Sequence, residues 1–547
     1  MVMGILKGPQ GGPRGTRDQS LGQVFFENAH KNGEKIFQID ADTGKYETFE
    51  QVKNRSVPVA LKLKKLGVGA EDVILLCCKN NADNIIPALA AWFIGASIAS
   101  VDPKQQYYDV RRSLNIVEPK VLFVVDDAVP LIEESLKDCE IVPVVIVIGR
   151  SDKYETMESM LSSNSDEVDS FQPVKIKKNQ TAVIIFSSGT TSTPKGICMS
   201  HYSLLYGMHG VSERFGYNLD VCMHFSSLFW ISGAMITGWC LAEAKTKVVG
   251  SGITGERFLE CIHKYKVTYA FTSGEFTYSI TNLDQDILSK YDTSSLQVLN
   301  LGGATMDPKQ IARVRAVLRH TRVTLVYGSS EAHCIAAFDV NSQKAYEEKL
   351  TSSGLPVPDV QLKLKPHISQ FVDVETRTPV GPAQQGEILI KSPYLFTGYY
   401  KLEKPDTFDD EGFLKQGDLG YYDEDGYVYV TDRISETFKY RTFHVSPSLV
   451  ERVFLQHPAV QEGVVFGIPH HGDRFHPAAC VVPKKDCDIN VDELIEFVNA
   501  RVSDSHHIRA GLQLLESLPR TLTGKIQRRL VKEKFLNNLK CKYQLFK

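Results

Sequence analysis

Residues 182–196 read Ala-Val-Ile-Ile-Phe-Ser-Ser-Gly-Thr-Thr-Ser-Thr-Pro-Lys-Gly. The first five form an apolar, β-rich run, which predicts a buried strand ending at Phe186. The loop that follows contains glycines, hydroxyl side chains and Lys195. Glycine lets backbone N–H groups point toward one anion, and lysine adds a mobile positive charge. The stretch therefore predicts a strand followed by a polyphosphate-binding loop.

Two other interpretations of this loop have to be weighed. A Walker A loop is excluded because Lys195 is followed by Gly196 and not by Ser or Thr. A flexible surface loop is the simpler alternative, since short Ser/Thr/Gly clusters usually mark loops. The motifs farther along the chain decide between these two.

Composition limits the class of protein. A chain of 547 residues is long enough for at least two domains. Hydrophobic residues make up 43% and charged residues 23%, as in soluble globular proteins, and the net charge of -3 gives no electrostatic reason to expect a nucleic-acid partner. Eleven cysteines without a CxxC pair favour a reduced, intracellular protein.

The first third of the chain predicts a doubly wound α/β fold. Between residues 35 and 125, apolar strand patterns alternate with helical patterns, which is typical of a parallel sheet. The apolar stretch 85–101 contains Pro87 and Gly95 and is short for a membrane span, so we expect a buried helix leading into a buried strand, with no integral membrane segment. Residues 1–20 are rich in Gly and Pro and predict a mobile tail.

Two further strands are expected to end beside the phosphate loop. Residues 295–303 end in Gly302-Gly303, and residues 321–331 end in Tyr327-Gly-Ser-Ser-Glu331. Ligands of open α/β sheets gather at the carboxyl ends of the strands. The three strand ends are therefore expected to converge on one ligand.

The last quarter of the chain predicts a smaller α+β domain. Ser446 and Pro447 are suited to begin a helix, residues 460–466 and 478–482 predict strands, and Asn490 with Glu493 predicts the start of another helix. The turn His470-His-Gly-Asp-Arg-Phe-His476 has two interpretations, a polar turn or a metal site, and the polar turn is favoured because structural zinc sites use four well-spaced ligands.

Motifs in a fixed order resemble those of the adenylate-forming enzymes, which include acyl-CoA synthetases, 4-coumarate–CoA ligases and beetle luciferases. They are the loop at 182–196, the strand end at 321–331, Gly412-Phe-Leu-Lys-Gln-Gly-Asp418, and Leu518-Pro-Arg-Thr-Leu-Thr-Gly-Lys525 near the C-terminus. The resemblance covers almost the whole chain. It implies a large domain over 21–432, with doubly wound sheets and a small β-barrel-like part, and a small mobile α+β domain over 433–547.

The resemblance also implies roles for single residues. Lys525, Glu331 and Lys195 would be catalytic, and Glu331 would hold Mg²⁺, which usually takes one or two protein carboxylates beside ATP. Without the resemblance, Glu331 would be read as an ordinary surface acid. The residues that would bind ATP are Ser187, Ser188, Gly189, Thr190, Thr191, Lys195, Gly303, Ala304, Tyr327, Gly328, Ser330, Asp418, Arg433 and Lys525.

The residues that the resemblance assigns to the acid and to coenzyme A agree less well with the family pattern. Phe229, Trp230 and Met235 would line an apolar acyl pocket, although Trp230 could equally fill a core. Lys439, Arg441 and Thr442 would face coenzyme A, but Thr442 stands where the family has glycine. Ser435 stands where the family has Asp or Lys, and Leu449 where it often has an acid.

Three functional interpretations remain open. The favoured one is an AMP-forming ligase that joins a fatty or aryl acid to coenzyme A, with ATP and Mg²⁺. The second is an adenylating enzyme with a weak or absent coenzyme A step, such as a luciferase-like protein. The third is a binding protein that has lost catalysis. The C-terminal Gln-Leu-Phe-Lys is not a Ser-Lys-Leu peroxisomal signal, so the cytoplasm is favoured as the compartment.

Overall fold

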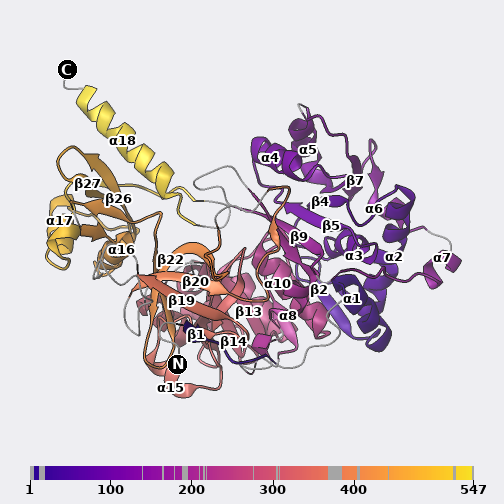
Figure 1. Cartoon of the computed structure of the whole chain (residues 1–547). Helices are drawn as coiled ribbons and strands as arrows, with labels where there is room; N and C mark the ends of the chain where they lie inside the picture. The colour runs from indigo at the N-terminus through magenta and orange to yellow at the C-terminus, as the bar shows by residue number, and fades with distance from the viewer. Residues whose placement is uncertain are drawn as a thin grey trace.

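The computed structural model describes residues 5–11, 19–137, 139–162, 165–177, 179–187, 195–208, 210–212, 216, 219–274, 276–303, 306, 308–366, 385–402, 407–441, 443–520 and 525–544. Its strands form five sheets, four in the large N-terminal part and one in the small C-terminal part (Figure 1). The phosphate loop at 187–195 follows β9 of the first sheet, and the strand ends at Gly303 and Tyr327 follow β14 and β15 of the second.

The first sheet has eight strands in the order β21-β10-β9-β5-β4-β6-β7-β8. Its middle strands are parallel, whereas β10 runs antiparallel to β9, so the chain returns along the same sheet after the phosphate loop. The strands are β4 (Val73–Cys77), β5 (Ser97–Val101), β6 (Val121–Val125), β7 (Val144–Ile148), β8 (Glu155–Thr156), β9 (Thr181–Phe186), β10 (Gly196–Ser200) and β21 (Gly398–Tyr399).

The second sheet has seven strands in the order β15-β14-β13-β11-β12-β2-β3, and all neighbours except β2 and β3 are parallel. Together the two sheets confirm the doubly wound α/β class. The strands are β2 (Ile36–Asp40), β3 (Tyr46–Thr48), β11 (Val221–Met223), β12 (Thr246–Val249), β13 (Tyr269–Ser273), β14 (Val298–Gly302) and β15 (Arg322–Leu325).

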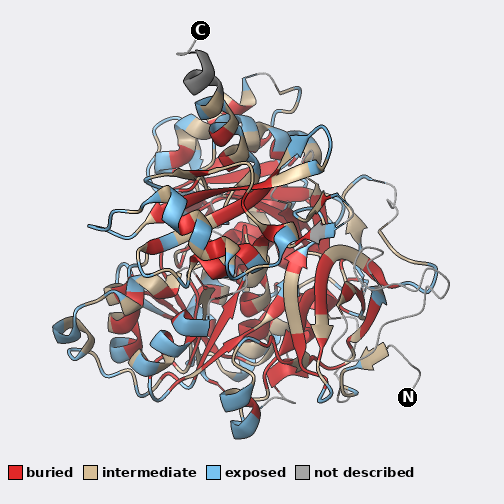
Figure 2. Ribbon diagram, turned by 90° about the vertical axis from the view of Figure 1, so that its left-hand side faces the viewer, coloured by how far each residue is buried: buried red, intermediate tan, exposed pale blue. Residues whose placement is uncertain are grey.

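A layer of helices lies between the two sheets (Figure 1). In this layer Trp92 of α3 donates from Nε1 to Ala182 O of β9 at 3.0 Å, while Trp239 of α10 packs edge-on against Tyr269 of β13 at 5.1 Å. Residues of both sheets and of these helices are buried (Figure 2), and α3 followed by β5 confirms the buried helix and strand expected over 85–101. The layer contains α1 (Leu21–Lys31), α3 (Ile85–Phe93), α8 (His201–Tyr206) and α10 (Ile231–Ala242).

The large part contains further helices, of which α2 packs against α1 and α3 of this layer. They are α2 (Phe49–Lys65), α4 (Tyr107–Val117), η1 (Asp126–Ala128), α5 (Val129–Leu136), α6 (Met157–Met160), α7 (Ser165–Asp169), α11 (Gly255–Tyr265), α12 (Phe276–Thr281), α13 (Gln285–Leu288), α14 (Pro308–Val317) and α15 (Gln343–Glu348).

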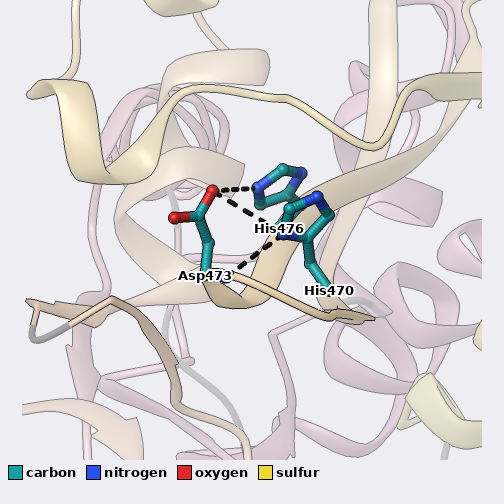
Figure 3. Close-up of side chains that lie close together, drawn as sticks. All are labelled: His470, Asp473 and His476. Atoms are coloured by element: carbon teal, nitrogen blue, oxygen red, sulfur yellow. Dashed lines mark hydrogen bonds and ion pairs between the residues drawn. The ribbon is translucent and has the colours of Figure 1, made fainter.

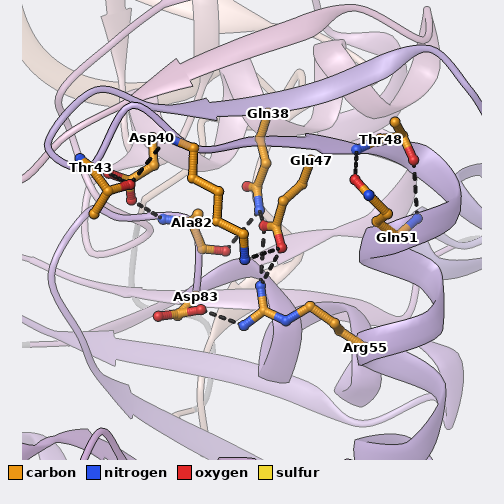
Figure 4. Close-up of polar contacts among 10 residues, drawn as sticks. Gln38, Asp40, Thr43, Glu47, Thr48, Gln51, Arg55, Ala82 and Asp83 are labelled. Atoms are coloured by element: carbon orange, nitrogen blue, oxygen red, sulfur yellow. Dashed lines mark hydrogen bonds and ion pairs between the residues drawn. The ribbon is translucent and has the colours of Figure 1, made fainter.

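A buried polar cluster fixes the β2–β3 hairpin to α2 (Figure 4). Glu47, 3% exposed in its side chain, accepts from Arg55 of α2 at 2.8 Å and from Gln38 of β2 at 2.7 Å. Burial raises the pKa of Glu47, but the charge of Arg55 and the hydrogen bonds from Lys45 and Gln38 outweigh it, so the pKa lies below its ordinary value. Arg55 also pairs with Asp83 ahead of α3.

The β-barrel-like part is, among the described residues, a five-stranded antiparallel sheet that does not close, in the order β1-β19-β20-β22-β23. Its first strand comes from the N-terminal segment that was expected to be a tail. A three-stranded sheet follows the end of β15. The strands are β1 (Ile5–Lys7), β19 (Gln361–Pro366), β20 (Gly386–Lys391), β22 (Leu414–Tyr422) and β23 (Val428–Arg433), with β16 (Tyr327–Ser329), β17 (His333–Ala337) and β18 (Leu355–Pro356).

The small C-terminal part has apolar cores of its own, one around Phe454 and one around Phe535. As predicted, Ser446 caps the first helix, accepting from Leu449 N–H. No described helix is long and apolar enough to cross a membrane. The elements are β24 (Phe438–Tyr440), β25 (Phe443–Val445), β26 (Val460–His470), β27 (Arg474–Pro483), β28 (Leu512–Leu514), α16 (Pro447–Phe454), α17 (Val491–Asn499), η2 (Asp504–His506) and α18 (Arg528–Gln544).

Candidate active site

Two hydrogen bonds join the ends of the phosphate loop. Ser187 N–H donates to Lys195 O at 2.9 Å, and Lys195 N–H donates to Ser187 Oγ at 3.0 Å. The antiparallel pairing of β9 and β10 positions both residues. Ser188, Gly189, Thr190 and Thr191 lie outside the described residues. Ser187 and Lys195 therefore hold the two ends of the loop together.

Asp418 is the centre of a buried polar cluster. Tyr327 donates from Oη to Asp418 Oδ2 at 2.7 Å, and Arg433 Nε lies 2.7 Å from Asp418 Oδ1. Asp418 and Arg433 are opposite each other on β22 and β23, so the hairpin itself sets their contact. Burial raises the pKa of Asp418, although the Arg433 charge and the Tyr327 hydrogen bond act against it. Each oxygen keeps a further lone pair for a ligand.

Glu331 and Lys195 both contact the side chain of Tyr399. Tyr399 donates from its hydroxyl to Glu331 Oε1 at 3.4 Å, and Lys195 Nζ lies 4.8 Å from the centre of the Tyr399 ring. Phe396 N–H donates to Glu331 O at 2.8 Å and fixes the backbone there. Burial raises the pKa of the Glu331 carboxyl above its ordinary value.

Lys525 approaches this cluster from the small C-terminal part. Arg520 pairs with Ile526, the residue after Lys525, in a β-bridge, and Gln527 N–H donates to Pro519 O at 2.8 Å. Although Lys525 is exposed, partial desolvation and the charge of Arg433 lower its pKa, while Asp418, Glu436 and Glu331 act in the opposite direction. The charge of Lys525 therefore interacts with the carboxylates of both Asp418 and Glu331.

The strand ends expected beside the adenine are partly described. Gly303 has φ +92° and no heavy atom within 4 Å of the place of a Cβ, so its backbone is open to an approaching ligand. A Cβ on Gly328 would lie 2.5 Å from His333 O, so only glycine fits at this point of β16 beside β17. Ser330 is half-buried, and Ala304 lies outside the described residues.

Three residues without a predicted role belong to this region. Tyr399 links Glu331 to Lys195, and Gln416 donates to Ser329 Oγ beside the strand end. Tyr399 stands in the motif Gly398-Tyr-Tyr, where an aromatic residue directly after a glycine was the available signal. Gln416 and Ser329 gave no such signal.

The residues expected to line the acyl pocket lie together at the start of α10. The Phe229 and Trp230 rings meet edge to face with centres 4.4 Å apart, and Trp230 precedes the helix that contains Met235. A Cβ on Gly233 would lie 2.1 Å from Ser227 O, so a glycine is needed for α10 to pack this closely on the preceding turn. The pocket itself stays a prediction.

The residues expected to face coenzyme A lie on the small part. Lys439 belongs to β24, Arg441 follows it with φ +53° and pairs from Nε with Asp473 Oδ1 at 2.7 Å, and Thr442 lies outside the described residues. Their role stays a prediction.

Glu331 suits Mg²⁺ by its chemistry. It is a half-buried carboxylate whose pKa is raised mainly because burial penalises its charge, and a divalent cation would relieve that penalty. Its hydrogen bond to Tyr399 occupies one of several lone pairs.

Comparison with known proteins gives consistent matches. The family model described as AMP-binding enzyme matches residues 25–400, and the model described as AMP-binding enzyme C-terminal domain matches residues 449–525. Luciferin 4-monooxygenase of Luciola mingrelica is 26% identical over 94% of this chain and 92% of its own length. 4-coumarate--CoA ligase-like 2 of Arabidopsis thaliana is 28% identical over 92% of this chain and 89% of its own.

Among solved structures, the luciferase-like enzyme from the nonluminescent mealworm Zophobas morio has a TM-score of 0.74 and 37% identity. The match covers 79% of this chain and 100% of that one.

Proposed function

This chain belongs to the AMP-binding enzyme family, within the adenylate-forming superfamily, and from that premise we propose that it is an AMP-forming carboxylic acid–CoA ligase. The observation that carries the proposal is that the charge of Lys525, on the small part, interacts with Glu331 and with Asp418, which Tyr327 and Arg433 contact at 2.7 Å on the large part. A cation on one part beside two carboxylates on the other suits a reaction on a nucleotide held between them.

The proposed first step joins the acid to AMP. A carboxylate oxygen forms a bond to the α-phosphorus of ATP, and the bond from that phosphorus to the leaving pyrophosphate breaks. Negative charge grows on phosphoryl oxygens, so fixed cations are the main catalytic requirement. Lys525 would neutralise charge between the acid and the α-phosphate, and Lys195 would do so at the phosphate loop.

The other residues would bind and orient the nucleotide. Asp418 would accept hydrogen bonds from the ribose hydroxyls, and Tyr327, fixed by its bond to Asp418, would stack on the adenine. Glu331 would hold Mg²⁺, which neutralises phosphate charge when bound. In the proposed second step the sulfur of coenzyme A forms a thioester with the acyl carbon, and AMP leaves.

The runner-up is an adenylating enzyme with a slow coenzyme A step. Two observations favour it: the most identical of the relatives described above is named luciferase-like, and Thr442 stands where the family has glycine. The threonine side chain would take space from the pantetheine arm, which typically costs about 1–3 kcal/mol, or roughly ten- to a hundredfold in rate.

One panel of carboxylic acids tests the proposal. Pyrophosphate release is measured for fatty and aryl acids with ATP and Mg²⁺, with and without coenzyme A, and products are identified by mass spectrometry. The proposal predicts acyl-CoA with at least one such acid. Pyrophosphate release with no acyl-CoA for any acid would favour the runner-up, and no acid-dependent release would contradict both.

Thr442→Gly separates the two interpretations within that assay. If Thr442 obstructs the pantetheine arm, the variant should convert preformed adenylate to acyl-CoA roughly ten- to a hundredfold faster, with unchanged pyrophosphate release. A parent that already transfers rapidly, and a variant that is no faster, would show that Thr442 does not limit transfer.

A further inference from the structure

Two histidines and an aspartate meet at the β26–β27 hairpin, where the aspartate, Asp473, also contacts Arg441. His470 is the last residue of β26, His476 lies in β27, and Asp473 lies in the turn between them (Figure 3). Each offers one ligand atom, and these atoms all lie within 4.8 Å of one another. The pairing of His470 with Arg474 and of Ile468 with His476 holds the two strands in register.

The distances within this trio are close to those of a metal site. Asp473 Oδ2 lies 2.8 Å from His476 Nε2 and 3.7 Å from His470 Nδ1. Two ligands at 2.0–2.1 Å from one tetrahedral ion stand about 3.3 Å apart. The two observed Asp473–histidine separations lie on either side of that value, and reaching it for one common ion also requires the His470 ring to turn.

Arg441 and the backbone orient the trio from outside. Arg441 Nε pairs with Asp473 Oδ1 at 2.7 Å, which leaves Oδ2 facing the histidines. His470 Nδ1 accepts from Asp473 N–H at 3.2 Å, so this nitrogen carries a lone pair.

The side chains have room to change conformation. His470 is 46% exposed, and its ring lies parallel to the His476 ring at 3.8 Å. Since parallel rings cannot both direct a lone pair at one ion, His470 would have to turn, and its exposure permits that rotation. Asp473 and His476 are about one-fifth exposed, which leaves a path for an ion and for water.

We propose that His470, Asp473 and His476 form a binding site for one divalent transition-metal ion of the zinc type. The ion would replace the hydrogen bond between His476 and Asp473 and the one received by His470, and water would complete its coordination. Two imidazoles favour such an ion over Mg²⁺ or Ca²⁺, which prefer all-oxygen ligands. The contact of Arg441 with Asp473 would persist as the outer support that metal-binding carboxylates usually have.

The test uses the full chain without ATP, titrated with Zn²⁺ by calorimetry and with Co²⁺ by visible absorption. We expect one ion per chain with a Kd on the order of 1–10 µM. The Co²⁺ spectrum should show nitrogen and oxygen ligands. It should lack the intense near-ultraviolet band of thiolate, which would appear if the exposed thiol of Cys487 bound the ion instead. Millimolar Mg²⁺ should not displace the ion.

Variants assign the ion to this site. His476→Gln and His470→Gln should each weaken Zn²⁺ binding about tenfold or more, whereas His471→Ala, in the same exposed turn but outside the trio, should leave it unchanged. Circular dichroism of the metal-free variants checks folding, and His470→Gln serves as the milder change because its side chain is the more exposed. Absence of saturable binding, equal loss in His471→Ala, or unchanged affinity in both glutamine variants would overturn the proposal.

Discussion

The pKa of the Lys525 amine is influenced by positive and by negative side chains of the candidate site. Desolvation and Arg433 lower its pKa, and Asp418, Glu436 and Glu331 partly offset them. Lys525→Ala should therefore remove one preorganised cation and slow acid-dependent ATP–pyrophosphate exchange about 10²–10³-fold, while the Kd for ATP changes little. Lys534→Ala, an exposed lysine of α18, is the matched control. Unchanged exchange in Lys525→Ala would remove this residue from the mechanism.

Asp418 combines a structural and a proposed binding role. Asp418→Asn keeps an acceptor for the Tyr327 hydroxyl but loses the ionised acceptor, which is worth roughly 1.5–3 kcal/mol per hydrogen bond. Calorimetry should show ATP affinity weakened about tenfold or more, with Asp410→Asn, an exposed acid ahead of β22, unchanged. Equal ATP affinity in Asp418→Asn and the parent would mean that Asp418 is structural only.

Lys247 is a buried lysine that the proposed reaction does not use. It is 2% exposed and donates only weakly, to Thr237 Oγ1 at 3.4 Å. Burial lowers its pKa from 10.5 to about 8. Between pH 8 and pH 10.5 the unfolded chain binds more protons at Lys247 than the folded chain does. The free energy of unfolding therefore rises with pH, by about 3 kcal/mol over this range.

Lys247→Met should remove that pH dependence and stabilise the protein most below pH 8, where the folded parent holds the buried charge. Urea unfolding at pH 7 and near pH 10.5 measures both effects, with Lys290→Met as the exposed control. A difference between Lys247→Met and the parent that does not change with pH would contradict the buried-charge explanation.

At the scale of elements, the β2–β3 hairpin depends on the pair Glu47–Arg55. Arg55→Met would leave the Glu47 carboxylate buried beside weaker partners, at a cost of about 3 kcal/mol in the free energy of unfolding. Because the pKa of Glu47 is lowered in the folded state, this contribution is present above pH 4.5 and is lost as pH falls through the folded pKa. The difference between parent and variant should therefore shrink in acid.

A double-mutant cycle with Glu47→Gln checks the coupling. The double variant should be more stable than Arg55→Met alone, because the unpaired charge is gone. Strictly additive effects of the two changes would indicate that Arg55 acts through packing and its contact with Asp83 instead.

Patterns with strong local signals predicted their elements well. The helical pattern of residues 48–66 forms α2, with Thr48 accepting from Gln51 N–H as its cap, and the apolar run 120–125 contains β6. The polar composition of residues 152–178 is typical of a surface loop, but they contain β8, α6 and α7. These elements are two to five residues long, too short for a period to be recognised.

Pairing between strands was harder to predict than the strands themselves. The return of β10 along β9 was missed because residues 196–200 carry no alternation to distinguish them from the following helix. In the candidate site, Asp418 and Arg433 were expected from the motifs, but their 2.7 Å contact follows from the register of β22 and β23. The meeting of His470, Asp473 and His476 likewise depends on hairpin geometry.

At the scale of the whole molecule, residues 434–437 connect the two parts. Ile434 N–H still donates to Gly417 O at 2.8 Å, and Asp432 accepts from Ser446 Oγ at 2.5 Å across the connection. With these contacts Lys525 lies near Asp418, the arrangement suited to adenylate formation. The boundary at residue 432 and the rotation that would bring residues 439–442 toward coenzyme A stay predictions from the family resemblance.

Lys525 of the small part and the carboxylates of the large part are proposed to form one adenylating site. The direct measurement is a single turnover with ATP, Mg²⁺ and an acid found active in the panel, without coenzyme A, in which acyl-adenylate and pyrophosphate are both quantified. We expect equal amounts of the two in the parent, approaching one per chain, and a rate about 10²–10³-fold lower in Lys525→Ala. Acyl-adenylate formed equally fast by Lys525→Ala, or pyrophosphate released without acyl-adenylate, would contradict it.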